Sequence, residues 1–127
     1  MRYAEVVIIG GGPAGMAAAL AARQAGAREV VIIEREACLG GILEQCIHNG
    51  FGLHRFHEEL TGPEYAERYE NMVREQHITC LCDTMVIDLS ADRRVTAVNQ
   101  KDGYFQIEAG AVVLAMGCRE KPRGALA

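Results

Sequence analysis

Residues 6–15 read Val6-Val7-Ile8-Ile9-Gly10-Gly11-Gly12-Pro13-Ala14-Gly15, and this stretch decides the fold. The apolar run predicts a buried strand, and Pro13 favours the first turn of a helix. The glycines follow the spacing Gly-x-Gly-x-x-Gly, in which Gly10 permits the tight turn and Gly12 lets the backbone approach a pyrophosphate. Gly15 allows the helix to pack closely on the strand. The spacing alone is weak, since the chain has 14 glycines, so its context must support it.

The residues that follow supply this context. The Ala-rich segment 13–25 predicts a helix that Gly26 ends, and the apolar segment 30–33 predicts a second buried strand. Glu34 stands at the end of that strand. A carboxylate there can accept both hydroxyls of an adenosine ribose and would repel a 2′-phosphate. The pattern therefore predicts a dinucleotide site that disfavours NADP, the alternative being an acidic residue in a surface loop.

The remaining elements predict an α/β domain. Residues 38–62 form a glycine-rich stretch without a clear period, which we expect to be a functional or ligand-covering loop. Thr61 is a predicted N-cap for a helix that runs to about residue 76. The segment 78–81 predicts a third strand, and 111–116 predicts a last buried parallel strand.

Three further short segments predict an antiparallel meander, because turn signals separate them: 84–89, 95–99 and 104–108. The predicted fold is therefore Rossmann-like, with a parallel sheet of about four strands, helices and a three-stranded antiparallel β-meander. We expect residues 1–118 to form one domain and 119–127 to be a linker or tail.

Composition narrows the function classes. The 127 residues suffice for one domain with its own core. A net charge of −4 argues against a nucleic-acid or anionic-membrane surface. The first apolar stretch is broken by Glu5, Pro13 and glycines, so it does not predict a membrane span. Five cysteines without a secretory signal indicate reduced thiols in a cytoplasmic protein.

Two residue pairs have the spacing of metal ligands but favour another interpretation. Cys80 and Cys82 share one face of a predicted strand, where small buried hydrophobes are the preferred interpretation and a metal pair the alternative. His54 and His57 lie one helical turn apart beside acidic residues, which favours a solvated face. We therefore expect no metal site.

Several motifs together resemble a known family. The glycine turn with its Gly-Pro-Ala-Gly ending, Glu34, the pair Gly40-Gly41 and the turn Ala115-Met116-Gly117 resemble the FAD-binding half of the pyridine nucleotide-disulphide oxidoreductase superfamily. The stretches 41–52 and 59–65 are similar to a bacterial branch of NAD(P)/FAD-dependent oxidoreductases often found with glycerol-3-phosphate dehydrogenase. Relatives of that branch include the FAD subunits of opine oxidase and hydrogen cyanide synthase.

The resemblance implies FAD as the cofactor, NAD(P)H as co-substrate of the intact enzyme, and another oxidoreductase subunit as a partner. Glu34 would hold the AMP ribose, and the backbone of Val86 would meet the adenine edge. Gly41 and Ile42 would lie along the dinucleotide toward the flavin. The implied cofactor-binding residues are Gly10, Gly12, Pro13, Ala14, Gly15, Glu34, Arg35, Gly41, Ile42, Val86, Ala115, Met116 and Gly117.

The disulphide chemistry of the family does not carry over, because the chain has no Cys-x4-Cys pair after the double glycine. Cys46 and His48 remain as catalytic candidates. For Cys46 the alternatives are a thiol near the flavin and a redox relay with Cys38. For His48 a hydrogen bond that caps the loop is the alternative.

The resemblance thus implies the FAD-binding portion of a flavoprotein oxidoreductase that transfers hydride between a nicotinamide or organic substrate and FAD. Family members continue into an NAD(P)H-binding domain and return for a fifth parallel strand. We therefore expect the 127-residue chain alone to be inactive. A non-catalytic nucleotide-binding module and a simple NAD-binding dehydrogenase domain are the alternatives.

Overall fold

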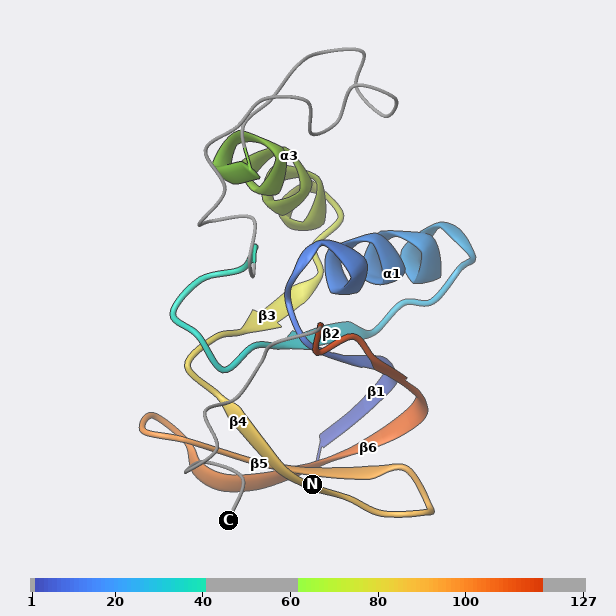
Figure 1. The fold of residues 1–127 in the computed structure, drawn as a ribbon. Helices are drawn as coiled ribbons and strands as arrows, with labels where there is room; N and C mark the ends of the chain where they lie inside the picture. Colours follow the sequence, from blue (N-terminus) through green and yellow to red (C-terminus); the bar gives the residue numbers. More distant parts are fainter. Residues whose placement is uncertain (1, 41–61, 118–127) are drawn as a thin grey trace.

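The computed structural model describes residues 2–40 and 62–117 of the chain (Figure 1). These residues form one six-stranded sheet in the order β3-β2-β1-β6-β5-β4. The elements, in chain order, are β1 (Arg2–Ile9), α1 (Pro13–Gln24), β2 (Val30–Ile33), α3 (Gly62–Glu75), β3 (Thr79–Leu81), β4 (Met85–Leu89), β5 (Arg94–Asn99) and β6 (Gly103–Leu114).

The strands β3, β2, β1 and β6 pair in parallel, which confirms the predicted parallel part of the sheet. Ile8 of β1 lies opposite Ile32 of β2, and both are buried on the helix side. Val7 and Ile9 are buried in a second cluster on the opposite face. Because side chains alternate along a strand, burial on both faces requires the continuous apolar runs seen in the sequence.

The helices α1 and α3 lie together on one face of the parallel strands (Figure 1). Met16 and Leu20 of α1 and Tyr69 and Val73 of α3 are buried against this face. The rings of Tyr65 and Tyr69 meet edge to face, with centroids 5.1 Å apart. The helix layer thus covers one face of the parallel strands, and the turn that precedes α1 follows the carboxyl end of β1.

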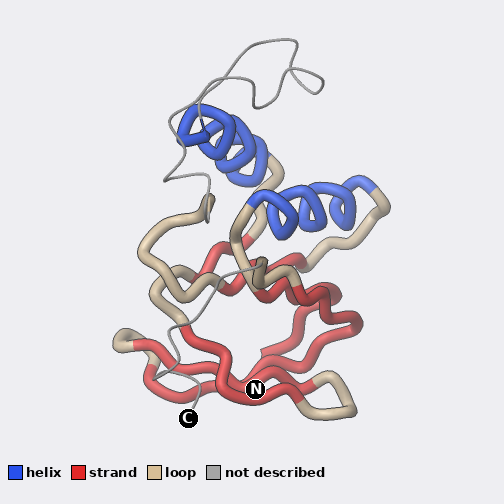
Figure 2. The backbone as a smooth tube through the Cα atoms, in the orientation of Figure 1, coloured by secondary structure: helices blue, strands red, loops and turns tan. Residues whose placement is uncertain are grey.

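The predicted meander is present and covers the other face. β4, β5 and the first part of β6 pair antiparallel, and Figure 2 shows them curving below the parallel strands, away from the helices. Val95 and Ile107 of the meander are buried with Val7 and Ile9 of β1. The sheet therefore folds back on itself and provides its own second layer.

One prediction about this region is wrong. The segments 104–108 and 111–116 were expected to be separate strands, but they form the single strand β6. Its first part pairs with β5, and its second part pairs with β1. Gly110 does not end a strand, because its backbone stays extended and its missing side chain lets β1 approach. A Cβ at Gly110 would lie 2.7 Å from the carbonyl oxygen of Glu5.

The second part of β6 has an open outer edge. The register between β5 and β6 ends where Arg94 meets Glu108, whereas β6 continues to Leu114 beside β1. Within the described sheet, residues 111–114 are therefore paired only on the β1 side. Ala111 and Leu114 are exposed along this edge. Unpaired backbone groups of this kind can accept another strand.

Several expectations concern residues that the structure does not describe. His54, His57 and the N-cap Thr61 lie outside the described residues, as does most of the glycine-rich stretch 38–62. Cys80 and Cys82 are half-buried and pack against the helix-side core, in agreement with their interpretation as small hydrophobes. Among the described residues, no helix is long and apolar enough to cross a membrane.

We expect Gly110→Ala to lower the free energy of unfolding by about 1–3 kcal/mol, because the added methyl group would push β6 away from Glu5. Urea unfolding followed by circular dichroism measures the change. Ala111→Gly on the exposed side of the same strand is the control and should cost no more than about 1 kcal/mol. An unchanged or raised stability of Gly110→Ala would contradict the close approach of the two strands.

Candidate functional site

A cavity of about 500 Å³ lies at the carboxyl ends of the parallel strands. It is formed where β1 and β2 end, where β4 begins and where the chain leaves β6. In α/β sheets of this kind, ligands bind at the carboxyl ends of the strands. The lining residues are Ile9, Gly10, Ile33, Glu34, Arg35, Thr84, Met85, Val86, Met116 and Gly117.

The glycine turn is built from backbone segments in direct contact. Gly10 has a φ of +114°, and a Cβ there would lie 2.2 Å from the carbonyl oxygen of Ala115. A Cβ at Gly15 would lie 1.8 Å from the carbonyl oxygen of Gly10. Side chains at these positions would separate α1 from β1 and β1 from the end of β6. The glycines therefore allow three elements to meet at one edge of the cavity.

The turn directs backbone donors toward this edge. Gly12 is the N-cap of α1 and has extended backbone angles, and Pro13 follows it in the first turn. The Gly10 N–H donates to the Ile33 carbonyl at 2.9 Å, and Pro13 has no N–H. The first N–H groups of a helix have no partners within the helix, and the helix dipole makes this end positive. Such an end favours an anionic ligand.

Glu34 is only 8% exposed, and its carboxylate binds two backbone groups. The Gly11 N–H donates to Oε1 at 2.8 Å, and the Glu36 N–H donates to Oε2 at 2.8 Å. Each carboxylate oxygen keeps further acceptor capacity after these bonds. Arg35 beside it is exposed and also lines the cavity, so the acid and the base that follow β2 reach the same space.

The wall opposite the turn comes from the start of β4. Thr84 is buried, and its hydroxyl donates to the Cys82 carbonyl at 2.9 Å and accepts from Asn99 Nδ2 at 3.1 Å. Val86 is half-buried among the apolar residues below the parallel strands. Because β4 is an edge strand of the sheet, one side of its backbone has no strand partner in the described sheet.

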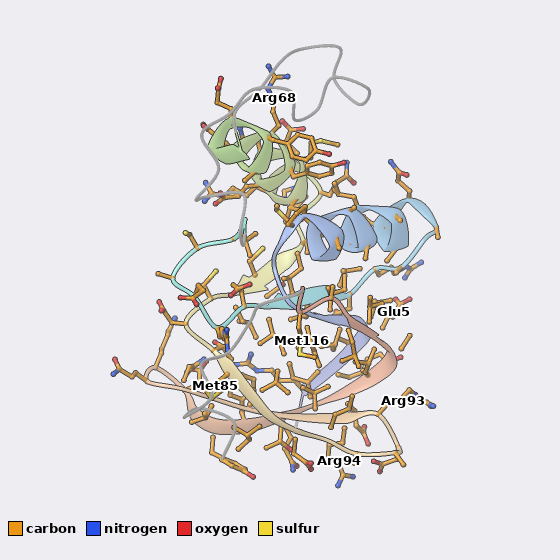
Figure 3. All side chains as sticks on the ribbon, in the orientation of Figure 1. Glu5, Arg68, Met85, Arg93, Arg94 and Met116 are labelled. Atoms are coloured by element: carbon orange, nitrogen blue, oxygen red, sulfur yellow. The ribbon has the colours of Figure 1, made fainter. Side chains whose placement is uncertain are left out.

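Two methionines from different parts of the chain line the cavity. Met85 at the start of β4 is 54% exposed, and Met116 after β6 is 67% exposed (Figure 3). The sequence interpretation included Met116 and missed Met85, together with Thr84, Ile9 and Ile33. A signal was available for Ile9 and Ile33, since they directly precede Gly10 and Glu34.

The structure brings most of the predicted site residues together. Those that line the cavity are Gly10, Glu34, Arg35, Val86, Met116 and Gly117. Gly12, Pro13, Ala14 and Gly15 continue the turn into α1, and Ala115 contacts Gly10. Gly41, Ile42, Cys46 and His48 lie outside the described residues. Among the described residues, no group of three or more His, Cys, Asp or Glu side chains could hold a metal ion.

Cys82 lies two residues before Thr84, whose hydroxyl donates to the Cys82 carbonyl. Burial raises the pKa of Cys82 from 9.0 to about 11, and the neighbouring Cys80 and Glu34 add smaller contributions in the same direction. At neutral pH Cys82 is therefore a thiol and not a thiolate nucleophile.

We expect Gly15→Ala to lower the free energy of unfolding by about 1–3 kcal/mol, because its methyl group would meet the Gly10 carbonyl. Alanine is the better helix former by about 1 kcal/mol, so helix propensity alone predicts the opposite sign. Ala17→Gly on the exposed side of α1 is the control for propensity. Urea unfolding of both variants measures the difference, and a more stable Gly15→Ala chain would contradict the close packing.

We expect the alkylation rate of Cys82 by iodoacetamide to rise with pH until about pH 11 in the folded chain. In urea the midpoint should return to the ordinary value of 9.0 because the thiol is then solvated. Peptide mass spectrometry after timed alkylation measures the rate at this residue. Equal midpoints in the folded and unfolded chain would show that burial does not control this thiol.

Comparisons with known proteins agree with this geometry. The sequence profile of the pyridine nucleotide-disulphide oxidoreductase family matches residues 4–125. The hydrogen cyanide synthase subunit HcnB of Pseudomonas protegens is 29% identical over 121 residues, which cover 91% of this chain and 24% of that protein. The chain therefore spans about a quarter of the length of this curated relative.

Solved structures show the same fold. Thioredoxin reductase from Streptococcus pyogenes is 24% identical with a TM-score of 0.72, over 97% of this chain and 38% of that one. L-proline dehydrogenase from P. horikoshii is 30% identical with a TM-score of 0.70, over 91% of this chain and 22% of that one. Since the family profile extends over nearly all of the sequence, the chain belongs to the FAD-dependent pyridine nucleotide-disulphide oxidoreductase superfamily.

Proposed function

We propose that this chain holds the adenosine diphosphate half of FAD in a flavoprotein oxidoreductase. The observation that carries the proposal is the meeting of the glycine turn and the Glu34 carboxylate at one cavity. Membership of the family indicates an oxidoreductase, and the residues that line the cavity are those that would bind the nucleotide.

The residues present fit the cofactor. A volume of about 500 Å³ lies within the range of nucleotide- and drug-sized pockets. Side chains are excluded at Gly10 and Gly15, which lets the end of β6 and the start of α1 pack closely beside the turn. The lack of a side chain at Gly12 would let a pyrophosphate approach the backbone. The N–H groups of Gly12, Ala14 and Gly15 would bind the pyrophosphate. Pro13 would open the helix behind them.

Glu34 would hold the AMP ribose. Its two oxygens would accept the ribose hydroxyls in addition to the backbone N–H groups that they already bind. A 2′-phosphate would place negative charge against this carboxylate, so NADP is disfavoured at this site. Arg35 would lie beside the adenosine.

The remaining cavity walls would enclose the base and the pyrophosphate. Val86 would offer backbone groups of the edge strand to the adenine, and Ile9 and Ile33 supply apolar surface below it. The turn formed by Ala115, Met116 and Gly117 would cover the pyrophosphate side. Gly41 and Ile42 would continue along the dinucleotide toward the flavin.

The chemistry belongs to the cofactor. When bound, the isoalloxazine ring of FAD would accept hydride from NAD(P)H or from an organic substrate, while the protein supplies position and electrostatics. Cys46 and His48 remain the candidates for residues that act near the flavin.

The narrower assignment is to the bacterial branch related to HcnB, itself a synthase subunit. Another oxidoreductase subunit would then be the partner. The location would be cytoplasmic, which the expected reduced thiols favour. Residues 1–118 would form the FAD-binding domain, and 119–127 would lead to an NAD(P)H-binding domain. The open edge of β6 at residues 111–114 would pair with the fifth parallel strand. Without that strand, the chain would not catalyse the reaction.

Titration of the 127-residue chain with FAD, NAD and ADP tests this function. We expect ADP to bind and to compete with FAD, because the cavity residues proposed to bind the cofactor all lie at the adenosine diphosphate half, which ADP and FAD share. We expect adenosine 2′,5′-bisphosphate to bind at least about tenfold more weakly than ADP, since Glu34 would repel its 2′-phosphate. Isothermal titration calorimetry measures the affinities.

Two outcomes would contradict the proposal. If ADP does not bind, the cavity is not an adenosine site. If NAD binds and FAD does not, the chain is a simple NAD-binding domain. Flavin absorbance retained after gel filtration distinguishes FAD from NAD independently of the calorimetry.

A further inference from the structure

The Glu34 carboxylate joins two segments that are far apart in the sequence. It accepts the Gly11 N–H from the glycine turn and the Glu36 N–H from the segment after β2, both at 2.8 Å. We infer that Glu34 is also a positioning residue, which holds the glycine turn in its nucleotide-binding shape before any nucleotide is present. This inference rests on the proposed function, because it concerns the same site.

Both polar backbone groups of Gly11, which belong to two successive peptide units, are held by hydrogen bonds. Its N–H donates to Glu34, and its carbonyl accepts the Gly40 N–H at 2.8 Å. A Cβ at Gly11 would lie 2.5 Å from Leu39 Cδ2 and 3.2 Å from Glu34 Cβ, so the same segment also covers it sterically. Residues 34–40 therefore set the orientation of Gly11. The next N–H in the chain, that of Gly12, is oriented as a consequence.

The backbone of Glu34 also binds the segment that leads from β3 into β4, which forms the cavity wall opposite the glycine turn. Its N–H donates to the Leu81 carbonyl at 2.8 Å, and its carbonyl accepts the Thr84 N–H at 3.0 Å. One residue thus connects the glycine turn, the end of β2 and the start of β4. A change of its side chain affects the donors for the pyrophosphate as well as the acceptor for the ribose.

A carboxylate suits this double role because it is an acceptor at both oxygens. Glutamine has one acceptor oxygen, so its NH₂ group would face either the Gly11 N–H or the Glu36 N–H. Serine is too short to reach both donors. The acid therefore cannot be exchanged for a neutral side chain to admit a 2′-phosphate without also releasing the turn. Discrimination against 2′-phosphates is in this way coupled to the shape of the phosphate site.

Amide hydrogen exchange of the unliganded chain, measured by NMR, tests the positioning role directly. In the unchanged chain the Gly11 and Glu36 N–H groups should exchange at least about tenfold more slowly than in Glu34→Gln. The measurement on the unchanged chain needs no variant to fold. Exchange at the rate of open amides in the unchanged chain would overturn the inference.

Glu5→Gln is the matched control. Glu5 Oε1 accepts one backbone N–H, that of Arg28, at 3.1 Å, from a partner 23 positions away, as for Glu34 and Gly11. Glutamine keeps the single acceptor that this bond needs, and the change in charge is the same. Glu5 lies on the opposite side of the molecule from Met85 in Figure 3. We expect unchanged exchange at Gly11 and Glu36 in this variant.

The affinities for ADP and for adenosine 2′,5′-bisphosphate distinguish a positioning role of Glu34 from a role in ribose binding alone. In Glu34→Gln and Glu34→Ser we expect the affinities for ADP and for adenosine 2′,5′-bisphosphate to fall together. If Glu34 acts only on the ribose, the bisphosphate should instead gain affinity in these variants, and that gain would overturn the inference. Failure of the unchanged chain to bind ADP, with Gly11 still protected, would overturn the proposed function and leave the positioning role supported.

Discussion

The close stacking of three backbone segments is the constraint on which the rest of the structure depends. The carbonyl of Ala115 occupies the space that a side chain at Gly10 would need. The carbonyl of Gly10 occupies the corresponding space at Gly15. This contact sets the end of β6 against β1 and the start of α1 against the same strand. The cavity, the helix N-terminus and the end of β2 share one edge because these elements approach so closely.

The second organising feature is that both faces of the parallel strands are buried by different means. α1 and α3 cover one face, and the meander, which is a continuation of the same sheet, covers the other. Two separate apolar clusters result, and neighbouring residues such as Ile8 and Val7 belong to different ones. This arrangement lets a chain of 127 residues bury strands on both sides while the carboxyl ends stay open for a ligand.

Most elements were predictable because their signals are local, whereas Arg35, Val86, Met116 and Gly117 at the cavity were implied by the family resemblance. The glycine spacing, the apolar runs and the acid after 30–33 each lie within a short window. The division of β6 was predicted wrongly for the same reason: within a window Gly110 resembles a break, and only the contact with Glu5 shows why glycine is needed there. Thr84 and Met85 were missed because nothing local distinguishes them from ordinary strand residues.

The sequence by itself determined the class of fold, the glycine turn and the identity of the acid, since these depend on residue type and spacing along the chain. Only the tertiary structure decided that the Glu34 carboxylate binds the Gly11 and Glu36 N–H groups, and that β6 runs unbroken from the meander to β1. The physical reason is that hydrogen bonds and close approaches between distant segments depend on how strands and turns pack. Residue spacing along the chain does not encode those distances.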